Sequence, residues 1–183
     1  MNLKLNKGQI ERFSRQIILK NIGASGQKKI IQSKVLIIGM GGLGCPVAEF
    51  LTRAGVGYLG IVDSDNVDLS NIHRQSLYDI NDLKKSKVVA AQKKLKRINS
   101  RIKVNCFKVR LNKNNYSKII KQYDYIVDGS DNFKTKFLIN DFCKTSKKFL
   151  VSGAISKFDG HIFTFDFKNK NTPCIRSFFQ DSQ

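Results

Sequence analysis

The sequence predicts an α/β fold in which one domain is built on a doubly wound, mainly parallel sheet. Short apolar runs alternate with amphipathic helical stretches, which is the order that parallel sheets require. Glycines crowd the turn after the first apolar run, and acidic residues end or follow two of the other runs. The 183 residues, 41% of them hydrophobic, suffice for one sizeable core but not for two full domains, so we assign residues 1–183 to a single domain.

Five apolar runs have the length and composition of buried parallel strands. We predict these strands at residues 35–38, 58–62, 103–108, 125–128 and 149–152. A further stretch, 155–167, alternates apolar and polar side chains as a half-buried strand does, and Asp159-Gly160 predicts a turn before it.

Apolar residues at helical spacing predict helices in front of these strands and between them. The predicted helices are 7–20, 27–32, 43–54, 84–98, 115–121 and 133–145. The order of strands and helices predicts a Rossmann-like sheet with two N-terminal helices. The segment 168–183 is polar and lacks a packing pattern, so we expect it to be poorly structured or incomplete.

The turn after the first strand has the composition of a phosphate-binding loop. Gly39, Gly41 and Gly44 stand at G-x-G-x-x-G spacing, which allows a tight turn, a close approach of backbone to phosphate and close packing of the next helix. The N-terminus of that helix offers free N–H groups and a positive dipole end to an anion. Asp63 ends the second strand, where a carboxylate can bind a ribose hydroxyl. Together these features predict a nucleotide site.

Three polar clusters follow the predicted strands at their carboxyl ends, where open α/β sheets bind ligands. The first is the glycine turn. The second begins at Asp63-Ser64-Asp65 and continues in a long polar loop to Asn71 and Arg74, and Lys87 lies just after this loop. The third is the segment 128–132, Asp-Gly-Ser-Asp-Asn.

The net charge of +19, from 33 basic and 14 acidic residues, admits two interpretations. It can reflect an acidic partner, such as a polyphosphate, a nucleic acid or an acidic protein, or a biased background of tolerant surface lysines. The lysines are spread along the chain with no Arg-rich run, which favours the background and argues against nucleic acid as the partner. No cysteine pair has C-x-x-C spacing, and no signal-like or membrane-spanning apolar run occurs, so we expect a cytoplasmic protein with free thiols.

The sequence resembles the E1-like ThiF/MoeB/HesA family, which adenylylates ubiquitin-like sulfur carriers in molybdopterin and thiamine synthesis. The matching stretches are spread over residues 12 to about 174. They are RFSRQIIL at 12–19, GMGGLGC at 39–45, AGVG at 54–57, DxDxxxxSNxxRQ at 63–75, Lys87, DGSDN at 128–132 and VSGA at 151–154.

The resemblance implies an ATP-dependent reaction at the C-terminal glycine carboxylate of a carrier protein that ends in Gly-Gly. It implies that Gly42 and its turn contact the nucleotide, that Asp63 holds the ribose and that Asn71 hydrogen-bonds nearby. Asp65 either caps a turn or touches the site.

By resemblance, Arg74 and Lys87 lie along the triphosphate and stabilise the leaving pyrophosphate. Asp131 holds Mg²⁺, a hard cation that prefers carboxylate and phosphate oxygens. Arg15 matches the family's arginine finger, which reaches the phosphates from the second subunit and implies a homodimer. Each of these side chains also has a purely structural interpretation, as a solvated charge or, for Asp131, as a helix cap.

The chain departs from the family at its C-terminal end. Many relatives hold a structural zinc with two C-x-x-C pairs, but the first position here reads Cys174-Ile-Arg-Ser177, and the second pair would lie beyond Gln183. Serine is a poor zinc ligand, so we expect no zinc site. We interpret the chain as a C-terminally truncated or degenerate member, or one that a second polypeptide completes. Some relatives keep a cysteine thiol in this region for a later transfer step, and Cys174 is an unconvincing substitute for it.

Two alternatives to the adenylylating enzyme stay open. One is a non-catalytic, degenerate nucleotide-binding remnant of the family, which the short C-terminus and Ser177 favour. The other is an oxidoreductase that binds NAD or FAD, which only the glycine spacing favours. The identity of the carrier is open as well, and relatives that modify a tRNA base leave a tRNA substrate possible.

Overall fold

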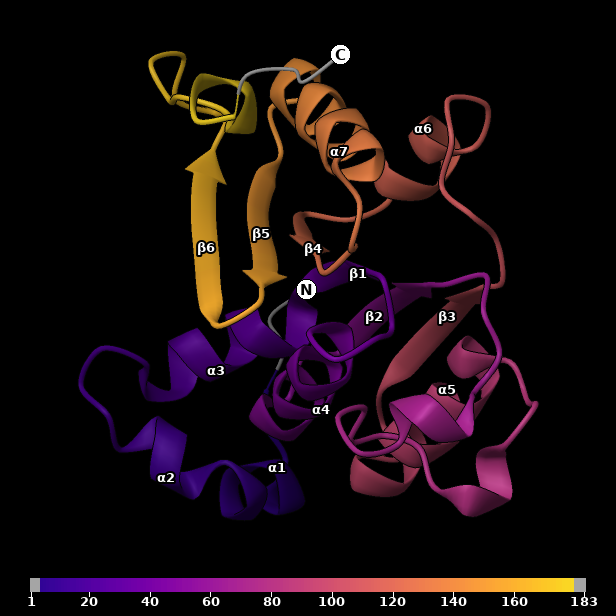
Figure 1. The fold of residues 1–183 in the computed structure, drawn as a ribbon. Coiled ribbons are helices and arrows are strands. Elements are labelled where there is room, and N and C mark those ends of the chain that lie inside the picture. Colours follow the sequence, from indigo (N-terminus) through magenta and orange to yellow (C-terminus); the bar gives the residue numbers. More distant parts are fainter. Residues whose placement is uncertain (1–3, 180–183) are drawn as a thin grey trace.

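The computed structural model describes residues 4–179 and arranges six strands in one sheet, in the order β3-β2-β1-β4-β5-β6 (Figure 1). The first five strands run parallel, and β6 runs antiparallel to β5. This confirms the predicted doubly wound, mainly parallel α/β fold. The strands are β1 Lys34–Ile38, β2 Tyr58–Val62, β3 Lys103–Phe107, β4 Tyr125–Asp128, β5 Phe149–Ser156 and β6 Asp159–Asp166.

The strand order reverses at β1: the chain goes outward to β2 and β3 and then returns to place β4 on the other side of β1. This strand lies between β2 and β4, and its last residue, Ile38, pairs with Val62 on one side and Asp128 on the other. The three strands therefore end at the same level, and the residues that follow them begin side by side. Such a reversal of strand order opens a crevice at the carboxyl edge of the sheet.

Helices cover both faces of the sheet, and a separate apolar core fills each interface. Alternate residues of β1 divide between them, because successive side chains of a strand point to opposite faces. Val35 and Ile37 join the core under α4 and α5, while Leu36 and Ile38 join the core under α6 and α7. These helices are α4 Gly44–Ala54, α5 Lys87–Ile98, α6 Tyr116–Ile120 and α7 Phe133–Thr145.

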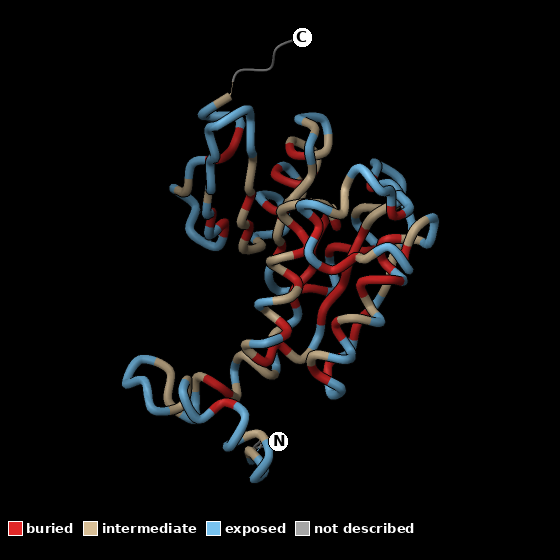
Figure 2. Tube along the Cα trace, turned by 60° about the horizontal axis from the view of Figure 1, so that its bottom comes forward, coloured by how far each residue is buried: buried red, intermediate tan, exposed pale blue. Residues whose placement is uncertain are grey.

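The N-terminal segment forms short helices that project from the body of the molecule (Figure 2). The single helix predicted at 7–20 is wrong, because Phe13 breaks it into α1 Lys7–Arg12 and α2 Ser14–Ile17. The ring of Phe13 is buried against Gly55, which turns the chain inward between the two helices. The next helix, α3 Gly23–Gln32, starts four residues earlier than predicted.

The hairpin of β5 and β6 turns two residues earlier than predicted. The two strands pair down to Ser156 and Asp159, so the connection is Lys157-Phe158, and Asp159-Gly160 already belongs to β6. Lys157 adopts a φ of 54°, the left-handed conformation that the first residue of a tight two-residue hairpin loop needs. The apolar alternation predicted a strand here, but the Asp159-Gly160 pair led us to place the turn two residues too late.

The described part of the C-terminal segment packs against α7, contrary to our expectation of a poorly structured tail. Cys174 and Ile175 are buried, and the Ile175 N–H donates to Asn140 Oδ1 over 3.0 Å. Arg176 forms a salt bridge of 2.8 Å with Asp141. These contacts join residues far apart in the sequence and involve only a few side chains, so apolar periodicity gave no sign of them. Residues 180–183, the rest of that segment, lie outside the described residues.

Within the described residues 4–179, no helix combines the length and the apolar character that crossing a membrane requires.

Candidate functional site

A cavity of about 500 Å³ opens at the carboxyl edge of the sheet, where β1, β2 and β4 end. Most of the residues singled out from the sequence line it, although they come from four separate segments. These lining residues are Gly39, Gly41, Gly42, Asp63, Asp65, Asn71, Arg74, Lys87 and Asp131. Two singled-out residues do not line it: Gly44 is buried beneath the turn, and Arg15 lies on the exposed surface of α2.

The glycine turn is compressed between the ends of β1 and β4. Gly39 has a φ of 88°, and a Cβ atom on it would lie only 2.8 Å from the Gly129 carbonyl oxygen. A Cβ atom on Gly44 would lie 1.8 Å from the Gly39 carbonyl oxygen, so only glycine lets α4 begin this close to the strand. The geometry thus gives these two glycines the tight turn and the close packing expected of them.

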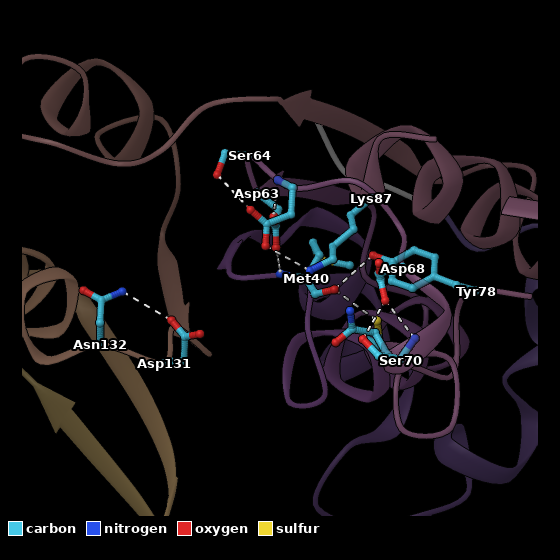
Figure 3. A network of polar contacts seen from close by, with 12 residues as sticks. Met40, Asp63, Ser64, Asp68, Ser70, Tyr78, Lys87, Asp131 and Asn132 are labelled. Carbon is cyan, nitrogen blue, oxygen red and sulfur yellow. Dashed lines mark hydrogen bonds and ion pairs between the residues drawn. The ribbon is translucent and has the colours of Figure 1, made fainter. Parts of the chain in front are cut away.

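Asp63 holds the turn from one side. Its Oδ2 accepts a hydrogen bond of 2.7 Å from the Met40 N–H, and its Oδ1 accepts one of 2.8 Å from the Asp65 N–H (Figure 3). Each carboxylate oxygen accepts one bond from the protein and keeps lone pairs for a further donor.

Two buried side chains hold the turn from below, and sequence reasoning missed this role for both. The Tyr78 hydroxyl donates to the Met40 carbonyl over 3.0 Å, and the Cys45 thiol donates to the same oxygen over 3.4 Å. Burial raises the pKa of the Cys45 thiol to about 11 and the pKa of Tyr78 far above its ordinary value. Both groups therefore stay neutral donors at physiological pH.

Lys87 presents a nearly buried cation to the cavity. It is the first residue of α5, and its side chain is 8% exposed. Burial and the positive end of the helix dipole both disfavour an ammonium there. Asp65 offsets this cost through a contact of 3.1 Å to Lys87 Nζ, while its own side chain stays 64% exposed. Asp65 thus pairs with Lys87 at the cavity.

Arg74 lies across the glycine turn. Its side-chain methylenes and Nε come within 3.8 Å of the point where a Cβ atom on Gly42 would stand. The guanidinium donates to Asn71 Oδ1 over 2.8 Å and to the Ser70 carbonyl over 3.2 Å. Both acceptors are neutral, so these bonds orient the guanidinium above the turn without cancelling its charge.

Asp131 stands on the other side of the cavity from Asp63 and Lys87 (Figure 3). Its exposed carboxylate accepts a hydrogen bond of 3.3 Å from Asn132 Nδ2. Asn132 in turn caps α7 by accepting from the Thr135 N–H over 2.9 Å. The cap of α7 belongs to Asn132, which leaves the Asp131 carboxylate free to face the cavity.

A buried ion pair supports the loop that carries Asp131. Asp128 is completely buried and accepts from Lys136 Nζ over 3.1 Å, from Ser152 Oγ over 2.7 Å and from the Ser130 N–H over 2.9 Å. Lys136 Nζ also donates to the Gly153 carbonyl over 2.6 Å. The pair therefore ties β4, α7 and β5 together. Among so many lysines, nothing in the sequence distinguished Lys136.

Replacing Lys136 by methionine is expected to lower the free energy of unfolding by about 3–5 kcal/mol, because it leaves the Asp128 carboxylate buried without its cation. Urea denaturation measures this loss. Lys134→Met removes a charge from an exposed position on the same helix and is expected to change stability by less than about 0.5 kcal/mol. Equal unfolding midpoints for the two variants would contradict the stabilising role of the pair.

The residues of the chain suit the two metals that the family resemblance raises to different degrees. Among residues 4–179, no three His, Cys, Asp or Glu side chains gather closely enough to hold a metal ion by themselves. At the position of the family's zinc pair, Cys174 faces Ser177 Oγ and the Lys144 ammonium, a set that does not suit zinc. Asp131 suits Mg²⁺ bound jointly with substrate phosphates, because such sites need only one or two protein carboxylates.

Comparisons with known proteins cover nearly the whole chain. The model of the ThiF family matches residues 13–183. The chain is 45% identical over 175 residues to "Adenylyltransferase and sulfurtransferase MOCS3" of Dictyostelium discoideum, and covers 41% of that protein. It is 40% identical over 180 residues to "Sulfur carrier protein adenylyltransferase" of Thermus thermophilus, and covers 66% of it. These alignments include 96% and 97% of the chain, which spans less than two thirds of either relative.

Solved structures show the same fold at lower identity. Escherichia coli MccB, solved with MccA-N7isoASN, superposes with a TM-score of 0.83 at 24% identity, over 93% of this chain and 51% of that one. E. coli tRNA N6-threonylcarbamoyladenosine dehydratase TcdA, solved with ATP, gives a TM-score of 0.77 at 22% identity, over 82% of this chain and 61% of that one.

Proposed function

The chain belongs to the ThiF family, and from this premise we propose that it transfers the adenylyl group of ATP to the C-terminal glycine carboxylate of a ubiquitin-like sulfur carrier. One observation carries the proposal: a single cavity gathers the glycine turn, the acids Asp63, Asp65 and Asp131, and the cations Arg74, Lys87 and Arg110. The printed names of the two curated relatives, an adenylyltransferase and sulfurtransferase and a sulfur carrier protein adenylyltransferase, support the same reaction class.

The adenosine part of ATP fits the side of the cavity formed by β2 and the loop after β3. Asp63 keeps lone pairs for a ribose hydroxyl beyond its two bonds to the backbone. Val62, Val109 and Leu111 line the same cavity and offer apolar surface to a purine base.

The triphosphate then lies over the glycine turn. No side chain caps the N-terminus of α4, but the Cys45 N–H already donates to the Gly41 carbonyl and Pro46 has no N–H. The N–H groups of the glycine turn just before the helix are therefore the ones left for phosphate oxygens. Arg74 lies across this turn, and Lys87 lines the same cavity from α5. Breaking the bond to pyrophosphate builds negative charge on the leaving oxygens, and cations held in place stabilise that charge without reorganising. Arg74 and Lys87 perform this role.

Asp131 would hold Mg²⁺ together with phosphate oxygens on the far side of the cavity. When bound, the ion neutralises phosphate charge and so lowers the repulsion that an approaching carboxylate meets. Asn132 holds the Asp131 carboxylate by a hydrogen bond, and the buried pair of Asp128 and Lys136 holds the loop.

The chemical step needs no general base from the protein. A C-terminal carboxyl group has a pKa of about 3.3–3.7 and is ionised at neutral pH. Its oxygen attacks the α-phosphorus of ATP, a C–O–P bond forms, and the bond from the α-phosphorus to the bridging oxygen breaks. The electron pair leaves with pyrophosphate, and the product is an acyl adenylate. The site therefore works by placing and neutralising charge.

Arg15 is proposed to reach the phosphates of a second subunit in a homodimer. It lies outside the cavity of its own chain, on the exposed surface of the projecting N-terminal segment (Figure 2). Exposed apolar side chains on this segment, Ile10, Ile18 and Leu19, suit an interface. Sedimentation equilibrium is expected to show a dimer, and a monomer with full activity would contradict this role of Arg15.

ATP–pyrophosphate exchange tests the proposed function. The protein is mixed with Mg²⁺, ATP, labelled pyrophosphate and a carrier of the molybdopterin or thiamine type that ends in Gly-Gly. Label is expected to enter ATP only with an intact carrier, and a carrier that lacks the last glycine is the matched control. No exchange with any carrier, from folded protein that binds ATP, would favour the non-catalytic remnant. Tight binding of NAD or FAD in preference to ATP would favour the oxidoreductase, and ATP consumption with tRNA alone would favour a tRNA substrate.

A further inference from the structure

The side chain of Gln75 is buried in the wall of the cavity and its hydrogen bonding is incomplete. The residue is 2% exposed and follows Arg74 in the loop that crosses the glycine turn. Its Nε2 lies 3.8 Å from the point where a Cβ atom on Gly41 would stand. Within the described part of the chain, Gln75 Oε1 is shut off from solvent and has no hydrogen-bond partner.

An unpaired acceptor in such a place is unusual, because buried polar groups are nearly always hydrogen-bonded. The backbone of Gln75 is fully engaged: its N–H donates to the Asn71 carbonyl over 3.1 Å, and its carbonyl accepts from the Tyr78 N–H over 3.1 Å. Within the described residues the amide Nε2 donates no hydrogen bond either, so the whole carboxamide is without a partner in this part of the chain. The missing partner therefore comes from outside the chain.

The chemistry of that partner follows from the acceptor. Phosphate oxygens of ATP have no proton to donate at neutral pH, so they cannot satisfy a carbonyl oxygen. The ribose has two hydroxyl donors. Asp63, the expected ribose ligand, bonds the Met40 N–H, and Met40 is the chain neighbour of Gly41, beside which Gln75 lies. The ribose hydroxyls are thus the donors of ATP expected closest to Gln75.

We propose that Gln75 is a ribose-positioning residue: its carboxamide, which no described protein group holds, turns toward the nucleotide so that Oε1 accepts a hydrogen bond from one ribose hydroxyl, while Asp63 accepts from the other. The inference rests on the proposed function, since it needs ATP in this cavity. Two acceptors from different parts of the loop after β2 fix the ribose in rotation as well as in place. The α-phosphorus is then held in line for the attacking carboxylate, which is how positioning lowers a barrier.

The test compares Gln75→Leu with the wild type in two measurements. Calorimetric titration gives the dissociation constants for ATP, 2′-deoxy-ATP and 3′-deoxy-ATP. We expect Gln75→Leu to weaken ATP binding about tenfold, the typical worth of one hydrogen bond. In the wild type, one deoxy analogue is expected to bind about tenfold more weakly than ATP, and in Gln75→Leu this analogue is expected to bind as ATP does.

Urea unfolding without nucleotide separates positioning from a structural role. Leucine removes the unpaired acceptor, so Gln75→Leu without ATP is expected to be at least as stable as the wild type. Gln122→Leu makes the same change at an exposed position outside the cavity and controls for the chemistry of the substitution.

Three results would overturn the inference. Wild-type affinity for ATP in Gln75→Leu would refute it and leave the nucleotide site standing. An equal loss for ATP and both deoxy analogues, with a lowered unfolding midpoint, would show that Gln75 only supports the turn. A wild-type protein that binds no ATP would overturn the proposed function together with this inference.

Discussion

Replacing Arg74 by alanine is expected to slow ATP–pyrophosphate exchange by at least about a hundredfold, the cost of removing one preorganised group from a developing charge. The guanidinium lies across the glycine turn and is oriented by Asn71 and the Ser70 carbonyl. The loss is expected mainly in the rate at saturating ATP, because the charge that Arg74 stabilises grows on the leaving pyrophosphate.

Arg74→Lys is the matched variant. It keeps the positive charge but loses the planar group that bonds Asn71 and Ser70 together, so we expect an intermediate rate. Arg53→Ala, which removes an exposed arginine paired with Glu49 on α4, is expected to leave exchange unchanged. A rate for Arg74→Ala within a factor of two or three of the wild type would refute the assigned role of this residue.

Replacing Asp131 by asparagine is expected to slow exchange by about a hundredfold and to raise the Mg²⁺ concentration needed for half-maximal rate. Asparagine keeps the size of the side chain and an oxygen, but loses the charge that holds a hard cation. Titrating Mg²⁺ at fixed ATP measures both effects. Asp159→Asn, in the β5–β6 hairpin, is the charge-matched control. An identical Mg²⁺ dependence in Asp131→Asn and the wild type would show that Asp131 does not hold the metal.

Much of the fold was predictable because its signals are local. The apolar runs that became β1, β2 and β4 are short, continuous and bounded by turns, as buried parallel strands are. Two boundaries failed for reasons that are not local. Phe13 breaks the first helix because its ring packs against Gly55, some forty residues along the chain. The hairpin turns at Lys157-Phe158 because the register with β5 outweighs the turn preference of Asp159-Gly160.

The lining of the cavity was predictable to the extent that topology dictates it. Parallel strands end at one edge, so a glycine turn after β1, an acid after β2 and a polar loop after β4 had to meet. The supports were not predictable, because each depends on which side chains the fold brings together. Tyr78 bonds Met40 and Lys136 bonds Asp128, and neither Tyr78 nor Lys136 belongs to a spacing that distinguishes it. Gln75 ends the matching stretch 63–75, but nothing in that stretch predicts that its side chain is buried against Gly41.

The central claim is that Arg74, Lys87 and Asp131 converge on the triphosphate of one ATP above the glycine turn. A crystal structure with Mg²⁺ and a non-hydrolysable ATP analogue tests it most directly. We expect the phosphates between Arg74 and Lys87, the ribose at Asp63 and the metal on Asp131. A nucleotide bound elsewhere, or in this cavity with its phosphates away from Arg74 and Asp131, would contradict the account.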